Sequence, residues 1–122
     1  MKLSNSTIYY SAMLLTETLQ KIDQKFPIRI NFYLQQNVNT LMTASREIEQ
    51  AKMSIAAQYG KLNESQTGYD IPPENVEIAN RELNDLFNLE QDLPIHIFKL
   101  SDFDGIELTY QQMSAIMFMI EE

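Results

Sequence analysis

Apolar residues recur along the first segment of the chain at alternating spacings of four and three residues. This spacing places them on one face of a helix and predicts that the helix packs along a second one. Asn5 or Ser6 is suited to cap the start of the helix, and Pro27 ends it. The apolar positions are Ile8, Ala12, Leu15, Leu19, Ile22 and Phe26.

A second segment repeats this spacing and stops at Gly60, a residue type common just after the last turn of a helix. Its start has two interpretations. Residues 28–34 alternate between apolar and polar side chains, as in a strand, but Pro27 also suits the first position of a helix. We favour one helix throughout. The seam positions are Leu34, Val38, Leu41, Ser45, Ile48, Lys52, Ile55 and Tyr59.

Polar residues, glycine and proline fill residues 61–73, which predicts a loop or a short extended piece. A third helix is expected to follow, because Pro73 suits a first helical turn and the acidic Glu74 suits the positive end of the helix dipole. The predicted apolar face of this helix consists of Val76, Ala79, Leu83, Leu86 and Phe87.

Residues 95–100, with the sequence IHIFKL, are rich in β-branched and aromatic side chains and predict a short strand after Pro94. Asp104 followed by Gly105 is typical of a turn, so residues 106–108 are expected to form a second strand that pairs back on the first.

Thr109 and Gln112 have the spacing of a capping box and predict the start of a last helix. The length of 122 residues fits one domain. We therefore predict a single helix-dominated α+β domain over residues 1–122. Its parts are a long helical hairpin (1–60), a loop (61–73), and an acidic part (74–122) with the third helix, a small β-hairpin and a C-terminal helix.

The charge of the chain lies mostly in its second half. The formal net charge is −8, and residues 61–122 carry thirteen acidic side chains against three basic ones. Direct binding of nucleic acid draws its affinity from Lys and Arg, so this composition argues against it and favours a protein partner. The absence of cysteine excludes disulfides and thiolate metal sites.

Neither end of the chain has the pattern of a targeting or membrane segment. The apolar run at residues 115–120 is far shorter than the roughly 20 residues that a bilayer span requires. The first residues lack the basic start and continuous apolar stretch of a signal peptide. We therefore expect a protein that stays in the cytoplasm and does not enter a membrane.

Asp102, Asp104 and Glu107 form the tightest acidic cluster and are the candidate metal ligands of the chain. A calcium-binding loop places a glutamate at its twelfth position, which is Met113 here. A hairpin turn explains the same three carboxylates, and we prefer that interpretation.

His96 is the only histidine, and the chain has no motif that would place a nucleophile beside it, so we expect a structural role. The glycines Gly60, Gly68 and Gly105 lie far apart, which excludes the usual phosphate-binding loops. The sequence thus predicts no catalytic residue and no cofactor.

The last helix carries more apolar side chains than one face can hold. The predicted core face is Met113, Ile116, Met117 and Ile120, which leaves Ala115, Phe118 and Met119 pointing elsewhere. Such residues are buried within the chain or covered by a partner or a second copy, and methionine suits adaptable contacts. The candidate interface residues are Met113, Ile116, Met117, Phe118 and Met119.

Several short motifs, spread over most of the chain, resemble those of one family. They are the Tyr-Gly pair at the end of the second helix, the pattern E-L-x-x-L-x-x-x-E from Glu82 to Glu90, a strand that leads into an acidic turn, and a final L-T-x-x-x-M followed by M-I-E-E. The chain is similar in these motifs to small proteins of unknown function from phages and prophages of low-GC Gram-positive bacteria. The resemblance implies a phage gene context and supplies no catalytic residues.

These observations lead to two hypotheses. The first is a non-catalytic phage or prophage accessory protein that acts through protein–protein contacts, in assembly or in association with the virion, and that also forms small homo-oligomers. The alternative is an acidic inhibitor that imitates nucleic acid and blocks a host DNA-binding or defence protein. The expected location is the host bacterial cytoplasm or the virion.

Overall fold

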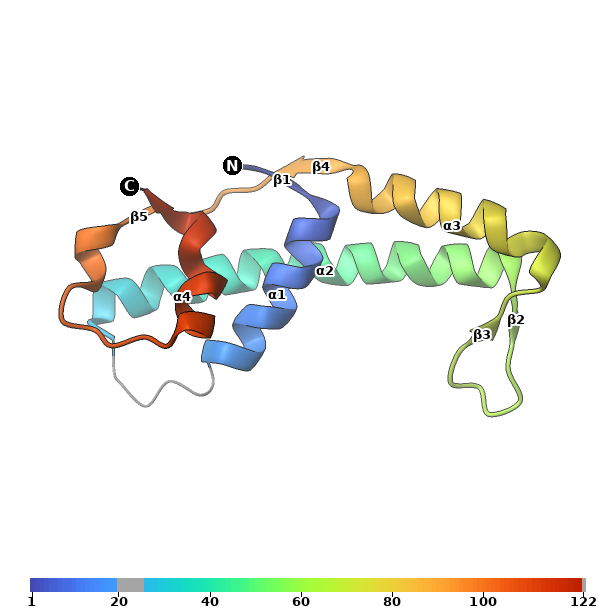
Figure 1. Cartoon of the computed structure of the whole chain (residues 1–122), viewed down its shortest axis with the longest axis horizontal. Coiled ribbons are helices and arrows are strands. Elements are labelled where there is room, and N and C mark those ends of the chain that lie inside the picture. Colours follow the sequence, from blue (N-terminus) through green and yellow to red (C-terminus); the bar gives the residue numbers. More distant parts are fainter. Residues whose placement is uncertain (20–25, 122) are drawn as a thin grey trace.

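The computed structural model describes residues 1–19 and 26–121, and helices predominate among them (Figure 1). These residues form four α-helices and three pairs of short strands, in agreement with a helix-dominated α+β fold. The helices are α1 (Asn5–Leu19), α2 (Ile28–Tyr59), α3 (Pro73–Asn88) and α4 (Tyr110–Ile116). The strands are β1 (Lys2–Ser4), β2 (Lys61–Leu62), β3 (Tyr69–Asp70), β4 (Glu90–Asp92), β5 (Phe98–Lys99) and β6 (Ile120–Glu121).

Helix α2 is the longest element, with 32 residues, and it resolves the question about residues 28–34. They form the first turns of the helix. Ile30 and Leu34 are buried one turn apart, whereas Ile28 and Phe32 are exposed. The apparent strand alternation is therefore the difference between an inward and an outward face of one helix.

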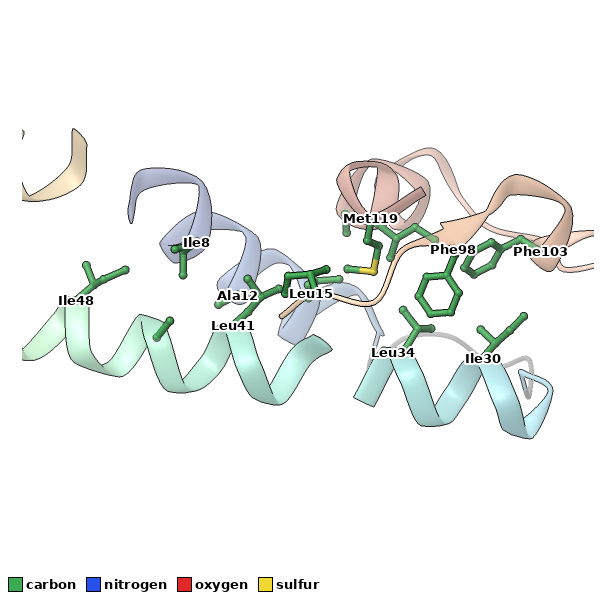
Figure 2. Packing of buried hydrophobic residues seen from close by; sticks show 14 residues of the cluster. Ile8, Ala12, Leu15, Ile30, Leu34, Leu41, Ile48, Phe98, Phe103 and Met119 are labelled. Carbon is green, nitrogen blue, oxygen red and sulfur yellow. The ribbon is translucent and has the colours of Figure 1, made fainter. Parts of the chain in front are cut away.

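Helix α1 packs against the middle of α2 through its predicted seam (Figure 2). Ile8, Ala12 and Leu15 are each at most 1% exposed. The side chain of Leu19 and the whole of Ile22 lie outside the described residues. Because α1 has 15 residues and α2 has 32, α1 covers only part of α2, and α3 lies along the C-terminal part of α2 (Figure 1).

The cap of α1 differs from both predicted residues. The Ser4 hydroxyl accepts the backbone N–H of Thr7 at 3.1 Å, so Ser4 is the cap. Asn5 is buried, donates its amide to the Leu86 carbonyl at 2.8 Å and accepts from Gln91 at 2.7 Å. Asn5 thus ties the start of α1 to the end of α3.

Residues 61–73, predicted to be a loop or a short extended piece, contain a small antiparallel hairpin. Its strands β2 and β3 pair Lys61 with Asp70 and Leu62 with Tyr69. The hairpin connects α2 to α3, which begins at the proline predicted to open it.

The predicted hairpin between residues 95–100 and 106–108 is wrong. Strand β5 has only two residues and pairs in parallel with β6 near the end of the chain, while residues 106–108 have no regular secondary structure. Asp102 accounts for the difference, because its carboxylate accepts the backbone N–H of Lys99 at 2.9 Å. This bond starts a 3-10 turn (Leu100–Phe103) directly after β5 and redirects the chain.

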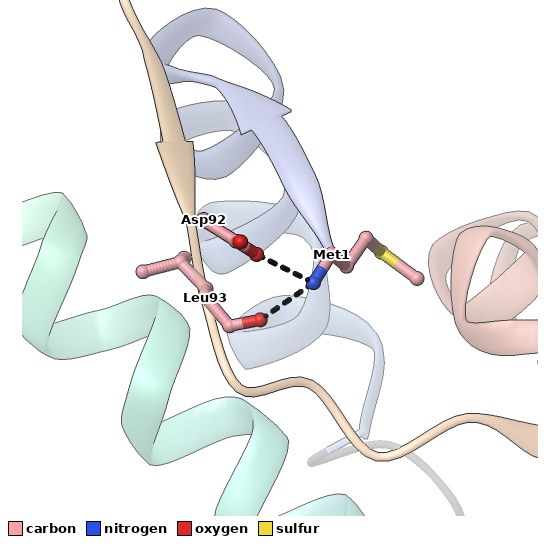
Figure 3. Close-up of polar contacts among 3 residues, drawn as sticks. All are labelled: Met1, Asp92 and Leu93. Atoms are coloured by element: carbon pink, nitrogen blue, oxygen red, sulfur yellow. Dashed lines mark hydrogen bonds and ion pairs between the residues drawn. The ribbon is translucent and has the colours of Figure 1, made fainter.

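One extended segment after α3 holds both terminal strands, since β4 pairs antiparallel with β1 and β5 pairs with β6. In Figure 3 the N-terminal ammonium of Met1 donates to the Asp92 carboxylate and to the Leu93 carbonyl, each at 2.9 Å. The hydrogen bond from the ammonium, and then its charge, lower the pKa of Asp92 below the ordinary 3.8.

The main core lies where α1, α4 and residues 95–103 meet residues 30–48 of α2 (Figure 2). Asn37 of α2 is 1% exposed within it. Its amide donates to the His96 carbonyl at 2.9 Å, and its oxygen accepts the His96 N–H at 2.8 Å. Throughout the described residues, every buried side-chain nitrogen or oxygen has a hydrogen-bond partner.

Candidate interaction surfaces

The three candidate metal ligands do not form a site in the structure. Asp102 caps the 3-10 turn and lies 3.9 Å from the Arg29 guanidinium. Asp104 is exposed in the turn that precedes Gly105, and Glu107 has a contact of its own. Among the described residues, no group of three His, Asp or Glu side chains is placed to hold a metal ion.

His96 makes the contacts of a packing residue. Its ring stacks on Tyr33, with the centroids 3.8 Å apart and the planes inclined by 7°, and it meets Phe98 edge-on at 4.8 Å. With its backbone held by Asn37, the residue joins the first turns of α2 to the segment before β5.

The C-terminal segment begins as predicted and ends differently. The backbone N–H of Gln112 donates to the Thr109 hydroxyl at 3.1 Å, and the Gln112 side chain accepts the Thr109 N–H at 2.9 Å, which confirms the capping box. Helix α4 then stops at Ile116, and a 3-10 turn (Met117–Met119) leads into β6.

The five predicted interface residues therefore divide into buried and accessible ones. Ile116 and Met119 are 1% and 0% exposed within the core of this chain, whereas Met117 is 52% exposed. Met113 and Phe118 are half-buried at the edge of the core. The expectation that Met117 faces inward and Met119 outward is wrong. A 3-10 helix has about 3.0 residues per turn instead of the 3.6 of an α-helix, so different side chains share a face.

A groove with a volume of about 410 Å³ runs between α1 and α2. Buried Ala12 and half-buried Met42 form its base, and exposed Glu17 and Arg46 stand on its α1 and α2 walls. Tyr9 lies at one end of the groove.

Tyr9 joins the two helices that form this groove. Its hydroxyl donates to Glu49 of α2 at 2.7 Å, and the Lys52 ammonium lies 5.6 Å from the centre of its ring. The hydrogen bond to Glu49, together with burial and the charge of that carboxylate, raises the pKa of Tyr9 above 10.0.

A second candidate surface is a two-helix arm, which we define as residues 49–59 of α2 together with α3 (Figure 1). The buried residues of α2 stop at Ile48, and α3 buries only Ala79. Exposed apolar side chains on the arm include Met53, Val76 and Ile78, which are 43%, 42% and 42% exposed.

Polar bonds hold the far end of the arm together. The Tyr59 hydroxyl donates to Glu82 at 2.8 Å, and the Asn75 amide donates to the Tyr59 carbonyl at 3.0 Å. The bond to Glu82, followed by burial and the negative charge, raises the pKa of Tyr59 above 10.0.

The acidic side chains of the second half are mostly at the surface. Of the twelve that the structure describes in residues 61–121, ten are exposed, and only Glu82 and Asp102 are half-buried. On α3, Glu74, Glu77 and Asp85 are exposed, and Arg81 lies 3.4 Å from Glu77.

Sequence reasoning missed both the groove and the arm. A signal for the groove was present in α1, where Tyr10, Met13 and Leu14 are apolar but lie outside the seam, and all three are exposed. No comparable signal for the arm is present in the sequence, because the seam of α2 continues to Tyr59 although the buried residues of the helix end at Ile48.

Within the described residues, no helix combines the length and the apolar character needed to cross a bilayer. Comparisons with protein-family models, with curated proteins and with solved structures found no match to this chain.

Proposed function

We propose that this chain is a non-catalytic protein that acts through protein–protein contacts, with the two-helix arm as its main contact surface. The observation that carries the proposal is the packing of α3, a helix of 16 residues that buries only Ala79. A helix gains most of its stability by burying an apolar face. On α3 that face is half-buried at Leu83, Leu86 and Phe87, but Val76 and Ile78 stay exposed, and exposed apolar patches are typical of a binding surface.

The ionisable groups with shifted pKa values support a non-catalytic role. Among the residues that the structure describes they are Tyr9, Tyr59 and Asp92, and the main cause of each shift is one hydrogen bond between distant parts of the chain. Catalytic groups are tuned by burial and charge within a cleft. The contacts here connect secondary-structure elements instead.

The proposed biological context is a phage or prophage, with action in the host bacterial cytoplasm or in the virion. Its support is the resemblance in the Tyr-Gly pair, the Glu82–Glu90 pattern and the last motif, which together extend over most of the chain.

The test is capture of a partner by the immobilised full chain from infected or lysogenic host cells. The double variant Val76→Asp/Ile78→Asp places two charges in the exposed apolar part of α3. Asn80→Asp/Asn84→Asp is the matched control, because it adds the same charge to exposed polar positions of the same helix. Capture should fall at least about tenfold for the first variant and stay unchanged for the control.

Circular dichroism establishes that both variants keep their helices. If the first variant is folded and retains the same protein as the unaltered chain, the arm is not the contact surface.

The exposure of ten acidic side chains in residues 61–121 favours a second candidate function, inhibition of a host protein by imitation of nucleic acid. Capture of such a target should weaken steeply between low and high salt, because exposed charges are screened. Glu74→Gln/Glu77→Gln/Asp85→Asn should weaken it as well, while Val76→Asp/Ile78→Asp should not. Salt-independent capture would contradict this function.

A further inference from the structure

The groove between α1 and α2 is a surface that neither proposed function uses. Its volume of about 410 Å³ is enough for one or two large side chains. Met13 stands on the α1 side and is 49% exposed, and Tyr10 and Leu14 beside it on α1 are 59% and 38% exposed. One continuous patch of α1 thus presents apolar side chains next to an apolar hollow.

The two walls of the groove carry opposite charges. Glu17 lies on the α1 wall and Arg46 on the α2 wall, and both are exposed. Neither takes part in the ion pairs found among the described residues, which join Met1 to Asp92, Arg29 to Asp102 and Arg81 to Glu77. Glu49, also on the α2 wall, accepts the Tyr9 hydroxyl.

We propose that a second copy of this chain docks on the groove and forms a two-fold symmetric dimer. A two-fold axis that lies in the face of the groove, perpendicular to the line from Glu17 to Arg46, places the α1 wall of each copy over the α2 wall of the other. Glu17 of each copy then faces Arg46 of the other, and Met13 of each copy enters the other copy's groove. In such an interface every contact occurs twice, so a surface with one acidic and one basic wall is complementary to itself.

The charges of the two walls favour a second copy over a partner segment that carries charges of one sign only. A basic partner segment would match Glu17 and be repelled by Arg46, and an acidic one would have the opposite problem. Two methionines, Met13 and Met42, line the same groove and adapt readily to an apolar contact. The net charge of −8 opposes association at long range, but salt at 0.15 M screens this repulsion beyond about 8 Å.

This dimer is independent of the arm. It concerns α1 and α2, so its failure would leave the proposed function of α3 untouched.

The test is the mass of the full chain in solution, measured by sedimentation and light scattering up to millimolar concentration in 0.15 M salt. The monomer mass is 14.2 kDa, and the dimer has twice that mass. Glu17→Lys and Arg46→Glu each place like charges opposite one another and should raise the dimer dissociation constant at least about tenfold. The double variant Glu17→Lys/Arg46→Glu restores opposite charges and should restore the dimer.

Arg81→Glu is the matched control, because it makes the same charge change as Arg46→Glu at an exposed position of α3. It should leave the dissociation constant unchanged, and circular dichroism verifies that all variants are folded. The proposal is overturned by a chain that stays monomeric at every concentration. It is also overturned by a dimer that the single variants do not weaken, or by a double variant that remains monomeric.

Discussion

Asn37 shows at the scale of one residue how α2 is joined to the segment before β5. Its carboxamide forms with the His96 backbone the two hydrogen bonds that a neighbouring strand would form, at 2.8 and 2.9 Å. A side-chain amide has the same donor and acceptor as a peptide group, so it can take the place of a missing strand. This polar residue stabilises the core because it provides hydrogen-bond partners for the N–H and C=O of His96.

Replacement of Asn37 by leucine should lower the free energy of unfolding by about 2–4 kcal/mol, because the N–H and C=O of His96 lose their partners in a part-buried place. Urea denaturation measures the change. Asn31→Leu, at an exposed position of the same helix, is the control and should alter stability by less than about 0.5 kcal/mol. Equal stability of the two variants would contradict the role of Asn37.

Tyr9 and Tyr59 make the same contact in two places, each donating its hydroxyl to a glutamate of a neighbouring helix. Their pKa values lie above 10.0 in the folded chain. Because the folded-state pKa is raised, each contact contributes its full stability below pH 10 and loses it as the pH rises through the folded-state pKa. Unfolding should therefore become easier in the alkaline range above pH 10.

Glu49→Gln and Glu82→Gln should each lower the pKa of the bonded tyrosine towards 10.0, since an amide removes the negative charge and weakens the hydrogen bond. Carbon NMR of tyrosines labelled at Cζ follows each ring during an alkaline titration. In each variant the other tyrosine is the internal control and keeps its raised pKa. A tyrosine that titrates as before without its carboxylate would show that the contact is absent.

At the scale of elements, Gly60 joins the end of α2 to the β2–β3 hairpin. Its backbone is extended, with φ of −128° and ψ of −179°, rather than left-handed as is usual for a glycine after a helix. A Cβ at this position would lie 2.8 Å from the Asp70 carbonyl oxygen and 2.9 Å from that of Ala56. The glycine is needed because two backbones approach each other closely.

Gly60→Ala should lower the free energy of unfolding by about 1–3 kcal/mol, because neither carbonyl can move without shifting the helix end or the hairpin. Gly68→Ala is the control in the loop of the same hairpin, where the nearest atom to a new Cβ is the Asn63 amide at 3.6 Å. It should alter stability by less than about 0.5 kcal/mol in the same denaturation experiment. Similar losses for both variants would argue against the close approach at Gly60.

At the scale of the whole molecule, α2 is one helix that passes through two parts of different packing. Its buried residues lie between Ile30 and Ile48, against α1 and the C-terminal segments. Residues 49–59 have no buried side chain; Glu49 and Lys52 still contact Tyr9 of α1, and α3 lies along this part of the helix (Figure 1). The free energy needed to open a segment locally rises with the apolar surface that the segment buries. The arm should therefore open more easily than the core. Opening of the arm would leave the core of the chain intact.

Amide hydrogen exchange should therefore be faster in α3 and in residues 50–59 than in residues 30–48 of the same helix. NMR-detected exchange at residue resolution measures the difference. Residues 8–15 of α1 are the internal control and should be protected like residues 30–48, because Ile8 and Leu15 are 0% exposed. Uniform protection along the whole of α2 would show that the arm is as stable as the core.

The sequence by itself determined the elements whose signals are local. The seam of Ile8, Ala12 and Leu15, the start of α3 at Pro73 and the capping box of Thr109 all matched the structure. Each signal depends on residues within one to three helical turns, so it acts whatever the rest of the chain does. The helix-dominated class followed from these elements.

Only the tertiary structure decided which distant groups meet. Strands of two residues carry no pattern of their own, and β5 exists because β6, near the end of the chain, pairs with it. The burial of Met119 depended on a change from α-helix to 3-10 turn, which the period of apolar residues does not reveal. Glu17 and Arg46 became the two walls of one groove only when α1 packed on α2. Each outcome rests on contacts between segments far apart in the chain, and the order of residues along one segment does not specify them.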